Sequence, residues 1–356
     1  REKYRPFPNP NDILMAIEAI KRSKRPLIIT GRGAKECKKE LKEFIDKTNI
    51  LYLDTQDSRG VVSNDHPNNV FTARHNTMSE ADLVILLGRK LDYQLAFGSP
   101  AIFKKAKFIR ISDSSHELLD NRRGFPEIFA NPEESLKQIT MNINNLMFDN
   151  NWIENIKTMH QDRIKKSNAK VVEKFGEDGK INPNLIFKEI KSLTSNNFIG
   201  IADGGDILSF ARVGLNTRYY LDSGVFGCLG VGVPYSIAAS EVHKDKKVIC
   251  VTGDGAFGFN AMEIDTAVRN NSNICIIISN NAGWNIEAHD QKINYGNRIA
   301  GTKLNHSDYA KMAIGLGAFG IRVENPEDLK NSIKLGLENT PSVIDVVTSS
   351  SFISSD

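Results

Sequence analysis

Two polar turns, each following an apolar run, hold the residue types best suited to chemistry. The run Val248–Val251 leads into Gly253-Asp254-Gly255, and the run Ile274–Ile278 leads into Asn280-Asn281-Ala282-Gly283. The carboxyl ends of parallel strands meet at one edge of a sheet, so both turns are expected there. A carboxylate, an amide oxygen and a backbone carbonyl are ligands that Mg²⁺ accepts. Asp254, Asn281 and the carbonyl of Gly283 therefore predict a site for Mg²⁺ bound to a diphosphate, the alternative being two unrelated turns.

A third turn of this kind is Asp203-Gly204-Gly205-Asp206, which follows the apolar run Phe198–Ala202. The N–H groups of its paired glycines can line a phosphate pocket. The segment Gly224–Pro234 holds four glycines in the nine residues up to Gly232, which implies backbone packed closely against another group. Asn260 is expected to cap a helix that starts near Ala261, with Glu263 completing a capping box.

Short apolar runs that alternate with helical stretches must position these turns. Such alternation predicts parallel sheets covered by helices on both faces. In the first half the expected strands are 26–30, 50–53, 83–87 and 108–111. One helix is expected to be capped by Asn11 or Asp12 and to end near Arg22, and another is expected over 36–48. In the second half the expected strands are 198–202, 248–251, 274–278 and 343–347, with helices over 185–193, 233–241, 261–270, 309–316 and 326–337.

The pattern predicts two doubly wound α/β domains. Residues 1–10 are expected to be a linker and 11–141 a central, Rossmann-like domain. A polar stretch over 142–182, helical near 152–174, is interpreted as the inter-domain connection, and 183–356 as the second domain. A length of 356 residues fits two domains.

Composition excludes several classes of protein. Net charge is only +3 and no dense Lys/Arg block stands beside aromatic residues, so no nucleic acid is expected as a partner. No apolar run is long enough for a membrane span, and no signal peptide is recognised. The four cysteines form no CxxC pair and are interpreted as core residues of a reduced, cytoplasmic protein.

The Gly253-Asp254-Gly255 and Asn280-Asn281 turns, with their spacing, resemble the thiamine diphosphate motif of the pyruvate oxidase and acetolactate synthase superfamily. The resemblance extends over the central domain and the diphosphate-binding domain. It implies that Asp254, Asn281 and the Gly283 carbonyl hold Mg²⁺, that Leu229 props the cofactor and that the carbonyl of Gly227 accepts from its aminopyrimidine. It also implies a set of residues around the diphosphate, namely Gly204, Gly205, Asp206, Gly255 and Ala256.

Two further segments indicate which members of the family the chain resembles. Gly88–Gly98 is similar to a segment of 2-hydroxyacyl-CoA lyases, oxalyl-CoA decarboxylases and acetolactate synthase-like proteins, whereas Asn281–Gly296 resembles acetolactate synthase-like large subunits most. The resemblance implies an enzyme that makes or breaks a C–C bond next to a carbonyl. An acetolactate synthase-like reaction on a 2-oxo acid is the main prediction, and a 2-hydroxyacyl-CoA lyase, an oxalyl-CoA decarboxylase or another 2-oxo acid decarboxylase is the alternative. Candidates for shaping the substrate pocket, each otherwise a packing or solvated residue, are Trp284, Glu287, His289 and Gln291.

Central domains of this family bind FAD, ADP or neither. The turn Gly31-Arg32-Gly33 after a strand could receive a phosphate, but Glu36 stands where the dinucleotide fingerprint has its third glycine. Arg89 and Asp113 are the other candidate contacts, with Asp113 suited to a ribose. Ala130-Asn131 replaces the Gly-Asp pair usual near the end of this domain, so nucleotide binding stays open.

The resemblance also implies a glutamate, supplied by a further N-terminal domain, that protonates the aminopyrimidine. That domain is expected in a longer version of this chain or in a separate one, because the sequence starts at Arg1 within an apparent linker. A homodimer or homotetramer is expected, since the family places its cofactor between subunits. Two other classes stay open, a non-catalytic nucleotide-binding subunit and an NAD-dependent dehydrogenase.

Overall fold

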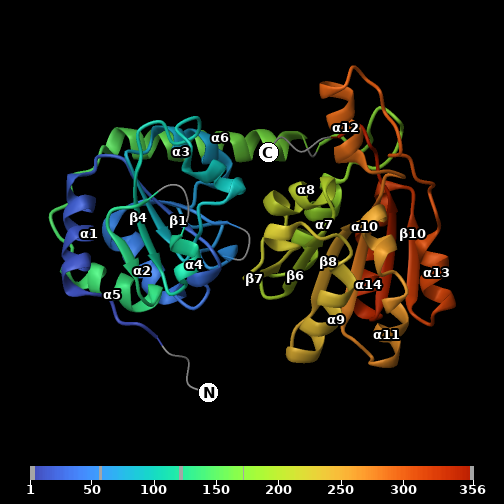
Figure 1. Ribbon diagram of the computed structural model, residues 1–356. Coiled ribbons are helices and arrows are strands. Elements are labelled where there is room, and N and C mark those ends of the chain that lie inside the picture. Colours follow the sequence, from blue (N-terminus) through green and yellow to red (C-terminus); the bar gives the residue numbers. More distant parts are fainter. Residues whose placement is uncertain (1–4, 56–57, 120–122, 171, 353–356) are drawn as a thin grey trace. The chain divides into compact units, whose positions relative to one another are not determined.

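The computed structural model describes residues 5–55, 58–119, 123–170 and 172–352. The chain divides into two compact units, Arg1–Ser167 and Asn168–Asp356. Each unit is built on one all-parallel sheet with helices on both faces (Figure 1). The prediction of two doubly wound α/β domains is therefore confirmed.

The first unit contains a five-stranded sheet in the order β2-β1-β3-β4-β5. Its strands are β1 Pro26–Thr30, β2 Leu51–Leu53, β3 Leu83–Leu87, β4 Lys107–Ser112 and β5 Glu127–Phe129. The first four were predicted because nearly all their side chains are buried, which gives continuous apolar runs. Strand β5 lies at an edge with one buried residue of three, so it leaves no such signal.

Two helical layers cover this sheet. Helices α1 Pro10–Arg22, α2 Lys38–Thr48 and α5 Pro132–Asn142 share one core cluster with Ile28 and Ile85, while α3 Arg74–Glu80 and α6 Asn150–Lys170 share the other with Leu27 and Leu86. Helix α1 starts at Pro10, a residue suited to the first helical position, and Asn9 caps it by accepting from the N–H of Asn11. The predicted caps Asn11 and Asp12 were therefore wrong.

The boundary between the units lies within α6, inside the stretch 142–182 that the sequence analysis assigns to a connection. The first turns of α6 are part of the first unit's core through Trp152, Ile153 and Ile156. No helix among the described residues is long and apolar enough to cross a membrane.

The second unit contains a six-stranded sheet in the order β10-β11-β9-β8-β6-β7. Its strands are β6 Ile199–Asp203, β7 Tyr219–Leu221, β8 Val248–Gly253, β9 Ile274–Asn280, β10 Phe319–Val323 and β11 Ser342–Val347. The four central strands were predicted. The edge strands β7 and β10 were missed because most of their residues are partly exposed and give no continuous apolar run.

Helices again form two layers. One face carries α7 Asn184–Leu193, α8 Asp206–Gly214 and α14 Pro326–Glu338, and the other carries α9 Gly232–Val242, α11 Glu263–Arg269 and α13 Tyr309–Gly315. The short helix α10 Asp254–Phe259 starts directly after β8. Helix α12 Asn285–Asn294 has no buried residue and projects beyond the carboxyl ends of the strands (Figure 1).

The chain reverses its direction across the second sheet between β6 and β8. After β6 it continues outward to β7, and it then returns to place β8 on the other side of β6. Asp203 at the end of β6 pairs with Thr252, and Gly253 at the end of β8 pairs with Ser279 of β9. Ligands of open α/β sheets bind at such a switch point, so the three predicted turns lie together where a ligand is expected.

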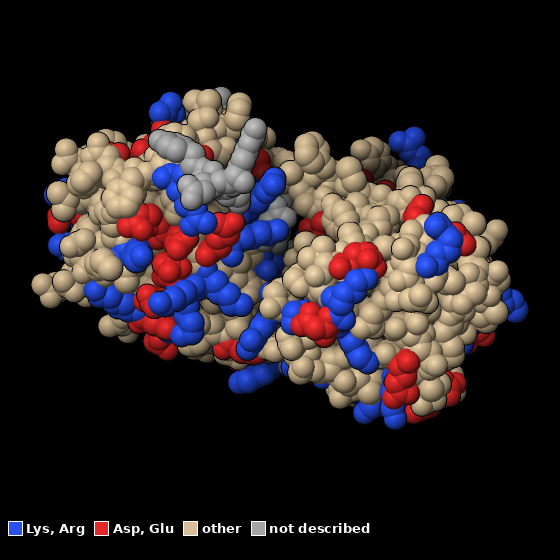
Figure 2. Space-filling view, turned by 90° about the horizontal axis from the view of Figure 1, so that it is seen from below, with Lys and Arg blue, Asp and Glu red and all other residues tan. Residues whose placement is uncertain are grey.

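Charged side chains of both signs are interspersed over the surface. On the face of the molecule shown in Figure 2, Lys and Arg lie among Asp and Glu rather than forming one basic field. Arg5 illustrates this mixing, since it pairs with Glu133 at 3.0 Å and with Glu36 at 3.1 Å. Such exposed pairs add little stability.

His160 of α6 gives the first unit a pH-dependent contribution to stability. Its ring is buried against Phe71, and Nδ1 lies 2.6 Å from the hydroxyl of Thr72. Burial lowers the pKa of His160 from 6.5 to about 4. The unfolded chain therefore binds the proton first as pH falls, so this stability is present above pH 6.5 and is lost between 6.5 and about 4.

We expect the first unit to lose about 2 kcal/mol of unfolding free energy through His160 between pH 7.5 and pH 5. Urea unfolding at both pH values measures it, and His160→Gln, which cannot titrate, is the control. Equal losses in the wild type and the variant would contradict this prediction.

Candidate functional site

Asp254 is a buried carboxylate directed at the turn that follows the neighbouring strand. It is only 2% exposed, because it begins α10 at the switch point under the loops of the edge. Its Oδ1 accepts from the N–H of Gly255 at 2.9 Å, and its Oδ2 accepts from the N–H of Gly283 at 3.2 Å. Burial raises the pKa of Asp254 to about 6, although these N–H bonds act in the opposite direction. A cation at the carboxylate would offset this cost of burial.

The two asparagines after β9 have different surroundings. Asn280 is fully buried, and its Nδ2 donates to Asp345 Oδ1 and to the carbonyl of Ser307, both at 2.9 Å. Asn281 Oδ1 is also buried, yet it accepts no hydrogen bond from any described residue. A buried oxygen without a donor is costly unless another group binds it. An orphaned amide oxygen beside a turn bound by Asp254 therefore fits a Mg²⁺ site.

Substitution of these neighbours is expected to have opposite effects. Asn281→Ala removes an oxygen that no described group satisfies, so stability should change by less than about 0.5 kcal/mol while Mg²⁺ affinity falls at least tenfold. Asn280→Ala breaks buried hydrogen bonds and should cost about 2 kcal/mol of stability. Thermal unfolding and Mg²⁺ titration of the two variants test this, and equal destabilisation by both would contradict it.

The glycine turns lie directly under the start of α12. Gly204 has φ +120°, a conformation that side chains rarely adopt. A Cβ on Gly205 would lie 2.7 Å from Ile286 Cγ2, and one on Gly255 would lie 2.8 Å from the Trp284 ring. Asn285 Nδ2 donates to Asp206 Oδ2 at 3.0 Å. The structure thus brings together the predicted turns after β6, β8 and β9.

The remaining residues predicted near the diphosphate belong to the same edge. Ala256 is buried in α10, and Asp206 is the first residue of α8. Burial raises the pKa of Asp206, whereas Asn285 and His289 lower it and Glu287 raises it. His289 and Glu287 therefore lie close enough to act electrostatically on this turn.

The four substrate-pocket candidates differ in their surroundings. The Trp284 ring packs edge-on against Phe259 with centroids 6.1 Å apart, which fixes it above the turn after β8. Gln291 is engaged with Ala300, since its Oε1 accepts from the N–H at 2.8 Å and its Nε2 donates to the carbonyl at 3.3 Å. Glu287 is exposed and His289 is half-buried. Among the described residues, no hydrogen bond from a side chain to the backbone is seen for Trp284, Glu287 or His289, although the backbone N–H of Trp284 donates to the carbonyl of Thr302 at 2.8 Å.

The loop over Gly224–Gly232 is anchored by two residues that the sequence analysis missed as site residues. The carboxylate of Asp203 accepts from the N–H groups of Gly230 at 3.3 Å and Gly232 at 2.8 Å. Asn260 Nδ2 donates to the carbonyl of Gly230 at 2.8 Å. The predicted capping role of Asn260 was therefore wrong, and α11 begins at Glu263 with no side-chain cap.

Gly227 and Leu229 precede the anchored residues Gly230 and Gly232 in this loop. Gly227 has φ +61° and is exposed, while Leu229 is half-buried. Cys228 is exposed, which corrects its interpretation as a core residue, whereas Cys37, Cys250 and Cys275 are buried as predicted. The strand-end position of Asp203, before two glycines, was the one signal that could have identified it.

The corresponding edge of the first unit is closed by backbone packing. The N–H of Gly31 donates to the carbonyl of Leu87, and the N–H of Gly33 donates to that of Gly88, both at 3.1 Å. A Cβ on Gly33 would lie 2.7 Å from the Gly88 Cα. These glycines allow two loops to approach, and their N–H groups are already used. The structure therefore gives the predicted FAD or ADP site no support.

The other residues of the predicted nucleotide site do not converge either. Arg89 is buried and forms two bonds with Asp92, at 2.7 and 2.8 Å, and one with Gln94 at 3.0 Å. Arg32 and Asp113 are exposed side chains. Arg89 thus has its charge satisfied within its own loop.

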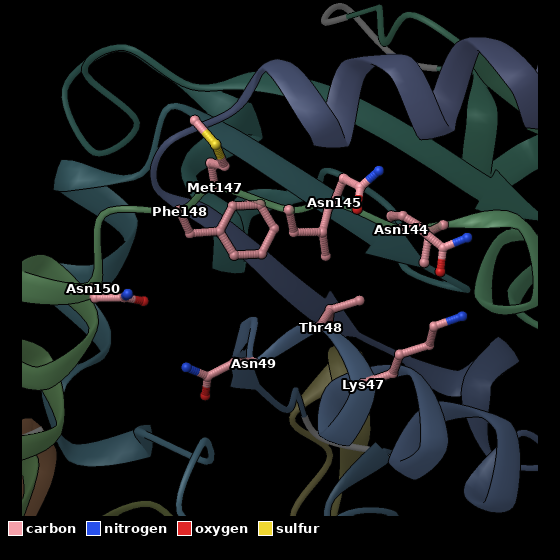
Figure 3. A pocket seen from close by; sticks show the side chains of 10 residues that line it. Lys47, Thr48, Asn49, Asn144, Asn145, Met147, Phe148 and Asn150 are labelled. Atoms are coloured by element: carbon pink, nitrogen blue, oxygen red, sulfur yellow. The ribbon is translucent and has the colours of Figure 1, made fainter.

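A pocket in the first unit lies at the opposite end of the strands, where α2 ends before β2 (Figure 3). Lys47 Nζ donates to the carbonyl of Thr140 at 2.6 Å, and Asn49 Oδ1 accepts from Asn68 at 2.9 Å and Lys157 at 3.2 Å. Lys47 and Asn49 of this pocket are thus engaged in holding the fold.

Two family models match the chain in agreement with this geometry. The model for "Thiamine pyrophosphate enzyme, C-terminal TPP binding domain" matches residues 203–346, from Asp203 into β11. The model for "Thiamine pyrophosphate enzyme, central domain" matches residues 13–139 of the first unit. Thiamine pyrophosphate is another name for thiamine diphosphate, so the predicted cofactor is supported.

Three similar curated proteins are named 2-hydroxyacyl-CoA lyases. Human 2-hydroxyacyl-CoA lyase 1 is 27% identical over 360 residues, covering 94% of this chain and 62% of that protein. Mouse 2-hydroxyacyl-CoA lyase 2 is 27% identical over 330 residues, covering 89% and 51%. The rice 2-hydroxyacyl-CoA lyase is 28% identical over 351 residues, covering 93% and 60%.

The chain spans between half and two thirds of the length of these relatives. Their names support the alternative given by the sequence, a 2-hydroxyacyl-CoA lyase, and give the acetolactate synthase-like prediction no specific support. One family model matches the first unit and the other matches the second. The chain therefore belongs to the superfamily of thiamine diphosphate-dependent enzymes.

Proposed function

We propose that this chain supplies the Mg²⁺- and thiamine diphosphate-binding part of a lyase that cleaves the C–C bond next to the thioester carbonyl of a 2-hydroxyacyl-CoA. The observation that carries the cofactor site is the buried, unsatisfied Oδ1 of Asn281 beside the turn held by Asp254. The names of the similar proteins support the substrate class.

Asp254, Asn281 and the carbonyl of Gly283 are the proposed Mg²⁺ ligands. Backbone N–H groups of Gly204, Gly205 and Ala256 would receive the diphosphate at the switch point, with Gly255, whose own N–H donates to Asp254, beside it. When bound, thiamine diphosphate would supply a nucleophilic carbon that adds to a carbonyl and a cationic ring that stabilises the carbanion left by breaking the C–C bond. The chain's own share is to hold and orient this group and to keep Asp254 ionised for the metal.

Trp284, Glu287 and His289 are proposed to shape the substrate pocket, because α12 begins over the turns that would hold the diphosphate. The part of the relatives' length that this chain does not span is proposed to supply the glutamate that protonates the cofactor. A homo-oligomer is proposed as the assembled form, as the resemblance implies.

The proposed cleavage balances without a further reactant. The substrate R–CH(OH)–CO–S-CoA loses the bond between its hydroxyl-bearing carbon and its thioester carbonyl. The hydroxyl proton leaves as that carbon becomes the aldehyde R–CHO. The thioester carbon retains the electron pair and gains a proton, which gives formyl-CoA.

The test is to incubate the full-length protein with Mg²⁺, thiamine diphosphate and a straight-chain 2-hydroxyacyl-CoA, and to identify products by mass spectrometry. We expect formyl-CoA and an aldehyde one carbon shorter than the acid. A parallel incubation with pyruvate serves as the comparison. Acetolactate from pyruvate, with no cleavage of the acyl-CoA, would contradict the lyase proposal and favour a carboligase. Cofactor binding without turnover of either compound would favour a non-catalytic subunit.

A further inference from the structure

The loop formed by residues 223–232, here called the glycine loop, is fixed at both ends by carboxylates at strand ends. At its start, Asp222 after β7 accepts from the N–H of Gly224 through Oδ1 at 2.9 Å. At its end, Asp203 of β6 accepts from Gly230 at 3.3 Å and Gly232 at 2.8 Å. Asn260 provides a third tie through the Gly230 carbonyl.

The middle of the glycine loop is presented to solvent. Val225, Gly227 and Cys228 are exposed, and Phe226 is 88% exposed. Asp203 directly precedes Gly204, so the end of the loop is attached at the turn proposed to hold the diphosphate. A ligand held there by its diphosphate would have its organic part beside the neighbouring segments of chain. The end of the glycine loop and the start of α12 both lie beside these turns.

Asp203 is suited to couple the loop and the turn. Its side chain is buried at 1% exposure, and each carboxylate oxygen accepts one N–H of the loop. Gly232 packs so closely that a Cβ there would lie 3.1 Å from Asp203 Oδ2. An asparagine at this position has one acceptor oxygen, and its NH₂ group would face an N–H. One buried donor of the loop would then have no acceptor.

We propose that Asp203 is a positioning residue that holds the glycine loop against the diphosphate turn, so that the loop is preorganised to receive the organic part of the cofactor. This inference rests on the proposed cofactor site but not on the proposed substrate. Without both acceptor oxygens the loop would occupy its binding conformation only part of the time. The apparent affinity for thiamine diphosphate would fall by that fraction.

The experiment compares two probes on the full-length protein, Mg²⁺ with thiamine diphosphate and Mg²⁺ with inorganic pyrophosphate, by calorimetric titration. Pyrophosphate reports on the turns and the metal alone, because it has no organic part to contact the loop. In Asp203→Asn we expect thiamine diphosphate to bind roughly 10- to 100-fold more weakly and pyrophosphate to change less than about threefold. Neither titration uses an acyl-CoA, so this result can be interpreted even if the proposed substrate class is wrong.

The matched control is Asp222→Asn at the other end of the loop. Asp222 accepts the Gly224 N–H through one oxygen, which the asparagine side chain can replace, so both affinities should stay within about threefold. Asn260→Ser, which removes the tie to the Gly230 carbonyl, should weaken thiamine diphosphate selectively and serves if Asp203→Asn does not fold. The proposal is overturned if Asp203→Asn binds thiamine diphosphate with wild-type affinity. If Asp203→Asn does not fold, wild-type affinity in Asn260→Ser overturns it. Equal weakening of both probes overturns it too.

Discussion

Replacement of Asp254 by alanine is expected to abolish Mg²⁺-dependent binding of thiamine diphosphate. The carboxylate is buried at the end of β8 and reaches the turn that carries Asn281, so no solvent-exposed acid can substitute for it. Loss of a group that only orients a metal ligand already costs roughly 10- to 100-fold in metal affinity, and loss of the ligand itself costs more. We therefore expect a weakening of at least about 100-fold.

Calorimetric titration in the presence of Mg²⁺ measures this loss. Asp265→Ala is the matched control, because Asp265 is a partly exposed acid of α11 paired with Arg269 on the surface and should leave the affinity unchanged. Thermal unfolding of the cofactor-free Asp254→Ala protein checks that it folds, because the substitution leaves the N–H groups of Gly255 and Gly283 without this acceptor. Unaltered affinity in this variant would refute the assignment of the metal ligand.

Asp345→Ala is expected to give the largest loss of stability in the second unit. Asp345 is fully buried on β11 and accepts from Asn280 at 2.9 Å, from the N–H of Tyr309 at 3.1 Å and from Arg322 at 2.7 Å. Removing one partner of a buried ion pair leaves the other charge uncompensated, which costs roughly 3–5 kcal/mol. The Arg322 side chain is 21% exposed and keeps a second partner, Glu324, at 2.8 Å, so we expect the lower end, about 3 kcal/mol.

Urea unfolding followed by Trp284 fluorescence measures this effect in the second unit, because the other tryptophan, Trp152, belongs to the first and can be replaced by phenylalanine in both proteins. Asp308→Ala is the control on the neighbouring helix. It removes the cap that accepts from the N–H of Lys311, which costs about 1 kcal/mol. A loss below 1 kcal/mol in Asp345→Ala would show that this network does not stabilise the fold.

The central strands and the turns that follow them were predictable from sequence because strands buried on both faces read as continuous apolar runs. Strand β9, with all seven residues buried, is the clearest case. Asp254 and Asn281 were predictable for the same reason, since each follows such a run. Edge strands β5, β7 and β10 were not, because their partly exposed residues resemble loop sequence.

The hydrogen-bond partners of the polar side chains could not be predicted from sequence. Asn260 has the spacing of a helix cap, but the fold brings the Gly230 carbonyl within 2.8 Å of its amide nitrogen. Asn260 donates to this carbonyl instead of capping the helix. Gly31 and Gly33 look like a phosphate loop, yet they serve a close approach to Gly88 across the sheet. Likewise, the sequence does not separate Asn280 from Asn281, because only the fold brings Asp345 to the first of them.

Hydrogen exchange with and without Mg²⁺ and thiamine diphosphate tests the location of the site most directly. The site described here predicts that the cofactor protects backbone amides in peptides covering residues 203–207, 224–232, 253–257 and 280–286, with Asp254→Ala showing no such protection. Protection confined to the first unit, around Gly31–Gly33 and Gly88, would contradict the assignment of the cofactor to the edge formed by β6, β8 and β9.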